Sequence, residues 1–159
     1  PRDWSSDVCS SDLWYFQAID SQLGINRVQE FLNKIEYGNQ TTSSNLDLYW
    51  SDFSLKISPL EQVTLLKKFN TNEFHLNFQN VFSVKNAIKI ASTPNGNFYG
   101  KTGTGRVNGQ DINGWFIGYV ETSDNSYYFA TNIQSDSNAT GKKAFEITSD
   151  ILKKLHIWN

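Results

Sequence analysis

The stretch from Asn97 to Ile133 constrains the fold of this chain more than any other part of the sequence. It contains three short runs rich in aromatic and β-branched residues, at Phe98 to Thr104, Trp115 to Thr122 and Tyr127 to Ile133. Polar sequences rich in Gly, Asn and Ser separate these runs, which is typical of consecutive antiparallel strands. The stretch therefore predicts a three-stranded antiparallel meander.

The middle strand of this meander is apolar on both faces. Because successive side chains of a strand point to opposite faces, Trp115 and Tyr119 share one face, and Phe116 and Val120 share the other. A sheet that is apolar on both faces has to be covered on both. We therefore expect helices above and below the sheet.

Helical patterns flank the meander. The clearest start is Ser58-Pro59-Leu60-Glu61, which combines a Ser cap, Pro at the first helical position and Glu at the third. The expected helices cover Trp14 to Leu23, Arg27 to Ile35 with Asn26 as its cap, Pro59 to about Phe69, about Asn80 to Ile90, and Lys143 to Leu155. The side chains expected to be buried are Val28, Phe31, Leu32, Ile35, Leu60, Val63, Leu65, Leu66, Phe145, Ile147, Ile151, Leu152 and Leu155.

Composition excludes several classes of protein. The chain has 159 residues, 38% of them hydrophobic, and a formal net charge of −2, which indicates one soluble globular domain. There is no basic excess to bind nucleic acid, and no apolar run approaches the eighteen or so residues that a membrane span needs. The single Cys9 and the distant His75 and His156 predict no metal site, and we expect no cofactor.

The first thirteen residues, PRDWSSDVCSSDL, match the rest of the chain in neither composition nor pattern. Residues 7–13, DVCSSDL, resemble the translated end of a sequencing-library adapter. We expect residues 1–13 to be a non-native segment and residues 14–159 to carry the fold.

Lys101-Thr102-Gly103 gives the front of the meander chemical content. It places an ammonium group and a hydroxyl group next to a residue without Cβ, where the backbone of a ligand can come close. A tripeptide is weak evidence by itself, and an exposed lysine before a turn explains it equally well.

Seven patches, in order along the chain, add specificity. They are WYFQ at residues 14–17, YGN at 37–39, YW at 49–50, SLKISPLEQV at 54–63, YGKTGTG at 99–105, NGWFIGYVE at 113–121 and YFATNI at 128–133. With these patches the sequence resembles the class D serine β-lactamases and, equally, the extracellular sensor domains of the related β-lactam receptor-transducers. The resemblance extends from Trp14 to Ile157.

The resemblance implies an α+β, transpeptidase-like fold with an antiparallel sheet flanked by helices, truncated here at its N-terminus. In that family a β-lactam acylates the serine of an S-x-x-K motif, whose carbamylated lysine is the base. A tryptophan indole steadies the carbamate, and Trp50 matches that position.

The resemblance also implies roles for the front of the meander. Lys101 and Thr102 match the cation and the hydroxyl that meet the substrate carboxylate, and Gly103 admits a close backbone. The N–H of Thr104 matches half of the oxyanion hole. Tyr37, Gly38 and Asn39 match a motif that we expect to hold the loop below the site.

The absence of the nucleophile motif is the main departure from the family pattern. No serine is followed three residues later by lysine, and the nearest imitation, Thr64 with Lys67, lies within a helix. We therefore expect the half of the domain that carries nucleophile and base to lie upstream of a truncation. The term "complete domain" means residues 14–159 joined to such a half.

Two other family positions are ambiguous. Ser11 falls where the family's S-x-V motif should lie, with Leu13 in the Val position, but both belong to the adapter-like segment. The arginine that binds the substrate carboxylate has no clear counterpart. Lys142 and Lys143 lie near its place, and a solvated helix start explains them as well.

Two functions remain open for the parent protein: a hydrolase that clears its acyl-enzyme, which we favour slightly, and a receptor whose acyl-enzyme persists and signals. A binding module with a coincidental Lys-Thr-Gly is the remaining option. The expected partners are β-lactam small molecules, with no nucleic acid. We expect an extracytoplasmic location, with a membrane anchor if the parent is a sensor.

Overall fold

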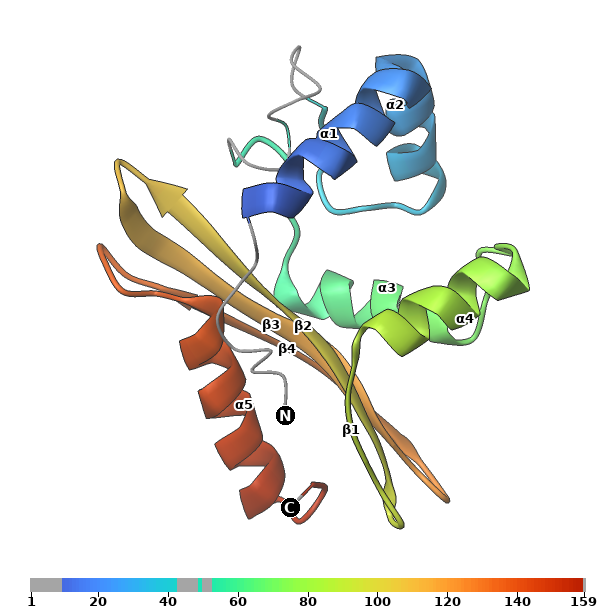
Figure 1. The fold of residues 1–159 in the computed structure, drawn as a ribbon, viewed down its shortest axis with the longest axis vertical. Helices are drawn as coiled ribbons and strands as arrows, with labels where there is room; N and C mark the ends of the chain where they lie inside the picture. The colour runs from blue at the N-terminus through green and yellow to red at the C-terminus, as the bar shows by residue number, and fades with distance from the viewer. Residues whose placement is uncertain (1–9, 43–48, 50–52, 159) are drawn as a thin grey trace. The chain divides into compact units, whose positions relative to one another are not determined.

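The computed structural model describes residues 10–42, 49 and 53–158 (Figure 1). They belong to two compact units, residues 1–61 and 62–159, which are described separately. The elements are α1 (Ser10–Leu23), α2 (Ile25–Lys34), α3 (Pro59–Asn70), α4 (Phe78–Ala87), β1 (Lys89–Thr93), β2 (Gly96–Val107), β3 (Gln110–Thr122), β4 (Ser126–Gln134) and α5 (Gly141–Lys154).

The first unit is built on the helix pair α1 and α2. Its core contains Val28, Leu32 and Tyr49, with Tyr37 and Leu55 packed against them. The buried pair Val28 and Leu32 confirms the predicted stripe in part.

Three details of the predicted second helix are wrong. Asn26 is not its cap, because Gly24 takes a positive φ of 78° and α2 starts directly after it at Ile25. Phe31 is exposed and Ile35 is only half-buried. The helix is amphipathic with a narrow apolar stripe, so only the two residues at its centre are buried.

Tyr49 makes the stability of the first unit depend on pH. Burial, the negative charge of Asp20 and a hydrogen bond to Asp20 together raise the pKa of Tyr49 to about 12, from an ordinary value of 10.0. Folding therefore favours the neutral phenol. Its stabilising contribution is complete below pH 10 and is lost as the pH rises from about 10 to about 12.

We expect the free energy of unfolding of the complete domain to fall across this pH range, as measured by urea denaturation at each pH. Tyr49→Phe should make the decrease smaller, because the phenol that must ionise is gone. The exposed Tyr15 provides the matched control, Tyr15→Phe, which should leave the pH dependence as it is. Parallel pH curves for wild type and Tyr49→Phe would contradict this prediction.

The predicted start of α3 is confirmed. Ser58 Oγ accepts the N–H of Glu61 at 3.3 Å, and Glu61 Oε2 accepts the N–H of Ser58 at 2.8 Å, so the two residues form a reciprocal capping box. Leu65 and Leu66 are buried as expected, whereas Leu60 is exposed. Leu60 precedes Leu65 by five residues, about 140° of helical rotation, and so lies on a different side of the helix.

The second unit contains a four-stranded antiparallel sheet in the order β1-β2-β3-β4. The predicted meander is confirmed as β2, β3 and β4, but β2 and β3 are longer than expected. They continue to a two-residue turn at Asn108 and Gly109, both with positive φ (48° and 77°). Asn-Gly is the preferred sequence for this hairpin turn.

The first strand of the sheet was not predicted. A helix was expected to continue to Ile90, but α4 ends at Ala87 and residues Lys89–Thr93 form β1. Apolar residues near the junction fit both a helical and a strand pattern, and pairing with β2 decides in favour of the strand.

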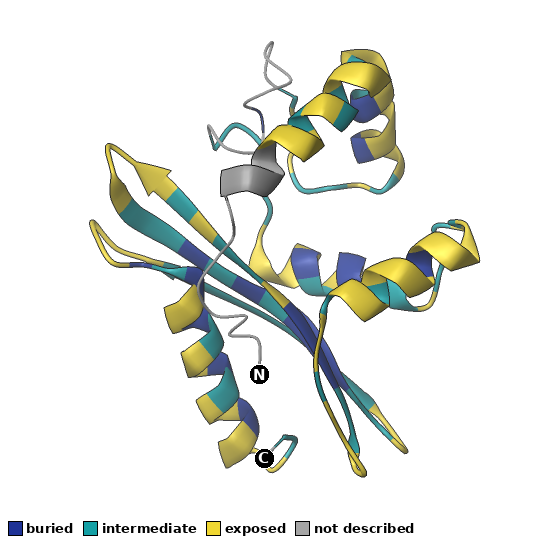
Figure 2. Ribbon diagram, in the orientation of Figure 1, coloured by how far each residue is buried: buried dark blue, intermediate teal, exposed yellow. Residues whose placement is uncertain are grey.

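Both faces of the sheet are covered, as the sequence predicted (Figures 1 and 2). On one face Phe116 and Val120 pack with Ala144 and Leu152 of α5. On the other face Tyr119 packs with Leu66 of α3.

The predicted buried face of α5 is wrong in part. Ile147, Ile151 and Leu155 are exposed, by 43%, 47% and 61%. The buried residues of α5 are Gly141, Ala144, Thr148 and Leu152. Most of these buried residues have small side chains, which let the helix lie close to the sheet. This stripe is therefore buried in place of the more apolar stripe of Ile147, Ile151 and Leu155.

Candidate functional site

One edge of β2 is unpaired where Lys101-Thr102-Gly103 begins. Strand β1 pairs only with residues 96–99 of β2, and the N–H of Gly100 donates to the carbonyl of Ile88 at 2.8 Å. Beyond Gly100, the described residues provide no strand for this edge. Because N–H groups of alternate residues in a strand point to the same side, the N–H groups of Thr102 and Thr104 face this edge.

The ammonium group of Lys101 lies at the same edge. Lys101 Nζ donates to the carbonyl oxygen of Thr102 at 2.7 Å. The carbonyl and the N–H of one strand residue point to the same side, so this carbonyl also faces the unpaired edge. The edge therefore combines a cation with the backbone donor of Thr104, which are two groups that acyl transfer needs.

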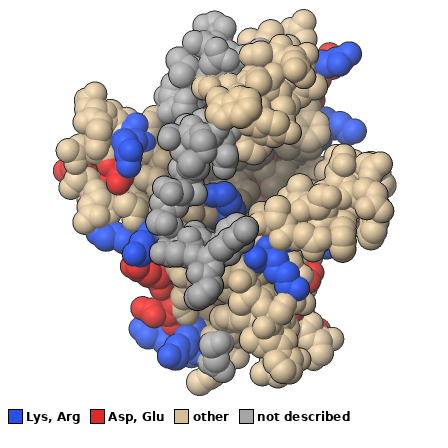
Figure 3. Space-filling view, viewed as in Figure 1, with Lys and Arg blue, Asp and Glu red and all other residues tan. Residues whose placement is uncertain are grey.

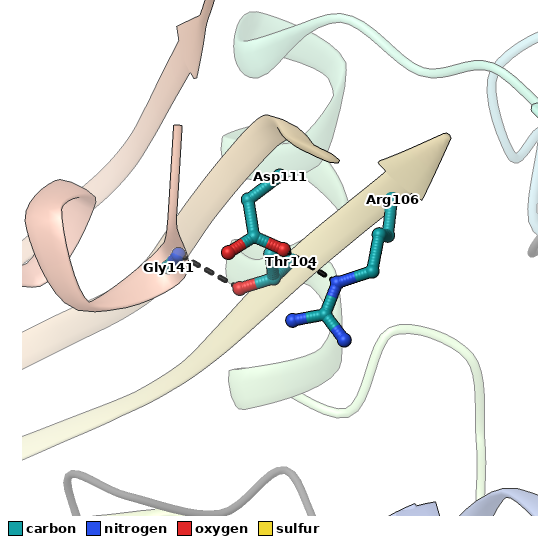
Figure 4. A network of polar contacts seen from close by, with 4 residues as sticks. All are labelled: Thr104, Arg106, Asp111 and Gly141. Carbon is teal, nitrogen blue, oxygen red and sulfur yellow. Dashed lines mark hydrogen bonds and ion pairs between the residues drawn. The ribbon is translucent and has the colours of Figure 1, made fainter. Parts of the chain in front are cut away.

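One face of this segment of β2 contacts the start of α5. The N–H of Gly141 donates to Thr104 Oγ1 at 2.9 Å (Figure 4). A Cβ added at Gly141 would lie 2.7 Å from the carbonyl oxygen of Gly103 and 2.9 Å from Thr102 Cβ. The hydroxyl of Thr104 thus holds α5 in place, while its N–H faces the open edge.

Gly103 has space on its own side. A Cβ added there would meet only Trp115 Cβ, at 3.8 Å. The absence of a side chain at Gly103 leaves room for a ligand, whereas its absence at Gly141 allows close packing within the fold.

This contrast predicts different effects for two matched substitutions in the complete domain. We expect Gly141→Ala to destabilise the fold by about 1–3 kcal/mol, because its Cβ overlaps the backbone of Gly103. Gly103→Ala should unfold at nearly the wild-type temperature, because its Cβ has space. Thermal unfolding measures both effects, and equal stability losses in both variants would contradict the assignment.

Lys142 is exposed and follows Gly141, which lies against Gly103 and Thr102 of β2. Lys142 and Lys143 lie in the first turn of α5, which contains no acidic residue. Cations are unfavourable at a helix N-terminus, so this arrangement concentrates positive charge there. Elsewhere on the face shown in Figure 3, Lys and Arg form separate small groups.

The structure adds an ion pair that sequence reasoning missed. Arg106 Nε donates to Asp111 Oδ1 at 2.6 Å across the β2–β3 hairpin. The carbonyl of Asp111 also accepts the N–H of Ala139 at 2.7 Å, which ties the hairpin to the segment before α5. The opposite charges on either side of Asn108-Gly109 were the available signal.

Asn39 joins two loops of the first unit. Its Nδ2 donates to the carbonyl of Ser54 at 2.7 Å, its Oδ1 accepts the N–H of Lys56 at 2.9 Å, and its own N–H donates to the carbonyl of Lys56 at 2.9 Å. A Cβ at Gly38 would overlap the carbonyl of Lys56. Burial raises the pKa of Tyr37. The contacts of Asn39 tie residues 38–39 to residues 54–56, and the role of the three residues in holding a loop below the site stays a prediction.

Two predicted site residues cannot be placed. Trp50 lies outside the described residues, and of Ser11 the structure describes the backbone in α1 but not the side chain. Within the described part of the chain, no three His, Cys, Asp or Glu side chains gather as a metal site. The helices described there are too short or too polar to cross a bilayer.

Comparison with known proteins identifies the family. Residues 3–153 match the sequence model of the penicillin binding protein transpeptidase domain. The chain is 44% identical to the regulatory protein BlaR1 of Bacillus licheniformis, over 99% of this chain and 27% of that protein.

Solved structures agree. The C-terminal domain of the Bacillus licheniformis BlaR penicillin-receptor matches with a TM-score of 0.88 and 46% identity, over 94% of this chain and 61% of that chain. A class D β-lactamase from Bacillus subtilis matches with a TM-score of 0.84 and 37% identity, over 94% and 60%. The chain thus spans about three-fifths of these solved domains, and it belongs to the penicillin binding protein transpeptidase family.

Proposed function

We propose that this chain supplies the cationic strand of a β-lactam-binding site in which a serine from the rest of the domain is acylated. The observation that supports it best is that the Lys101 ammonium group and the Thr104 N–H both lie at the edge of β2 that has no partner strand among the described residues. The strand backbone fixes the N–H of Thr104, and the hydrogen bond to the Thr102 carbonyl orients the ammonium group, so both donors are in place before a ligand arrives. Such preorganisation is the condition for electrostatic stabilisation of a developing oxyanion.

The steps divide between this chain and the rest of the domain. The serine oxygen attacks the lactam carbonyl, the C–N bond of the ring breaks, and the base motif of the rest of the domain moves the proton to the ring nitrogen. From this chain, the N–H of Thr104 donates to the carbonyl oxygen as it becomes negative. Lys101 and Thr102 bind the ring carboxylate, Lys142 adds positive charge at the start of α5, and Gly103 leaves space for the ring.

Between the two fates of the acyl-enzyme, sequence identity favours the sensor. At equal coverage of this chain, identity is 46% to the penicillin-receptor domain and 37% to the class D β-lactamase. We therefore propose an extracytoplasmic sensor domain of a membrane receptor as the parent, with β-lactam hydrolysis as the alternative.

A pulse-chase experiment separates these functions. The complete domain is made in two versions, by joining residues 14–159 to the N-terminal part of the Bacillus licheniformis receptor domain or to that of the Bacillus subtilis class D β-lactamase. Each is labelled with a fluorescent penicillin, chased with unlabelled penicillin and followed on denaturing gels. Label that persists for hours in both versions indicates a sensor, and rapid loss in both, with turnover of a chromogenic cephalosporin, indicates a hydrolase. A domain that is never labelled would overturn both.

A further inference from the structure

The proposed contacts place the groups of a bound β-lactam in a fixed order along strand β2. In a penicillin, the ring carboxylate and the acylamino side chain lie on opposite sides of the lactam carbonyl. With the carboxylate at Lys101 and Thr102 and the carbonyl at the N–H of Thr104, the acylamino side chain extends past Thr104 toward Arg106. This step rests on the proposed function.

Arg106 is within reach of that position. A regular strand rises about 3.3 Å per residue, and the β2–β3 register shifts between Gly105 and Arg106, so Thr104 and Arg106 are separated by at most roughly 7 Å. Arg106 bends back to cover part of this distance, because its side chain runs along β2 in the direction of Thr104 (Figure 4). A substituent that leaves the lactam ring on this side therefore comes near the guanidinium group.

The guanidinium group keeps most of its donors. It carries five N–H groups, and the pair with Asp111 uses Nε alone among the contacts of the described residues. The side chain of Arg106 is 65% exposed, whereas that of Asp111 is 23% exposed. The pair therefore fixes the inner edge of the guanidinium group and presents its outer nitrogens to solvent, where a carboxylate can bind through two parallel hydrogen bonds.

We propose that Arg106 is a specificity-determining residue that binds an anionic group on the acylamino side chain, so that the domain prefers β-lactams carrying a second carboxylate. Asp111 holds the guanidinium group in position and offsets part of its charge. The preference is consequently moderate, on the order of 3–10-fold, as expected for an exposed ion pair with good geometry.

Carbenicillin and benzylpenicillin provide the test, because they differ by one carboxylate on the acylamino side chain. The measured quantity is the ratio of their second-order acylation rate constants with the complete domain. We expect Arg106→Gln to lower the carbenicillin-to-benzylpenicillin ratio about 3–10-fold, and Arg106→Lys to keep only part of it, because lysine retains the charge but not the two parallel hydrogen bonds. Raising the salt from about 0.05 to 0.5 M should lower the wild-type ratio toward that of Arg106→Gln, because exposed charges are screened.

Lys154→Gln is the matched control, since it removes one exposed charge at the opposite end of α5. It should leave the ratio unchanged. A ratio that is the same in wild type, Arg106→Gln and Arg106→Lys, with benzylpenicillin still acylating, overturns this inference and leaves the proposed function standing. If neither penicillin acylates the wild-type complete domain, the proposed function fails and the inference with it.

Discussion

The 159-residue chain will form no covalent adduct with a fluorescent penicillin. It contains no S-x-x-K sequence and therefore lacks an activated nucleophile. Its proposed contribution is limited to groups that donate hydrogen bonds to the oxyanion and to the substrate carboxylate. The complete domain should be labelled under the same conditions. If the chain alone gives a labelled band, and the band persists when residues in 1–13 are mutated, this expectation is contradicted.

Within the complete domain, Lys101→Ala should slow acylation by a factor on the order of 10² or more. The ammonium group lies at the edge that we propose binds the ligand, and loss of one preorganised donor to developing charge typically has an effect of this size. Lys89→Ala is the control, because Lys89 is an exposed lysine on the neighbouring strand β1. An unchanged acylation rate in Lys101→Ala would make Lys101 a structural residue.

The isolated chain is also expected to aggregate or to remain molten rather than unfold cooperatively. Strand β4 forms an edge of the sheet with no Lys or Pro to protect it, and the described residues provide no partner for it. Ile147, Ile151 and Leu155 form an apolar stripe along the exposed side of α5. At roughly 25 cal/mol per Å², a few hundred Å² of such surface is large against a typical stability of about 5–15 kcal/mol.

A double substitution separates this explanation from general instability. Ile147→Glu with Ile151→Lys replaces the stripe by a favourable pair at i and i+4. We expect it to increase the monomeric fraction of the isolated chain, measured by size-exclusion chromatography and light scattering. In the complete domain it should instead destabilise by about 2–5 kcal/mol, if the stripe is covered there.

Glu146→Gln with Asp150→Asn is the control on the neighbouring polar face of α5, and it should change neither property. A monomeric isolated chain with one sharp thermal transition and well-dispersed amide resonances would show that residues 14–159 fold by themselves. The aggregation prediction would then be wrong.

Local periodicity explains what was predictable. The alternation around Trp115 and Tyr119 identified a meander covered on both faces, and Ser58 with Glu61 identified a helix start. These signals lie within a few residues of one another, so neighbouring side chains determine them. Lys101-Thr102-Gly103 was visible for the same reason, although its open edge was not.

Only the tertiary structure decided how distant segments meet. Thr104 and Gly141 are 37 residues apart, and their hydrogen bond depends on α5 packing through Ala144 and Leu152 rather than through Ile147 and Ile151. Both stripes of α5 are apolar enough to be buried, so the helix pattern alone could not choose between them. The choice is made by close packing against Phe116, because small residues let the helix backbone approach the sheet and the larger ones do not.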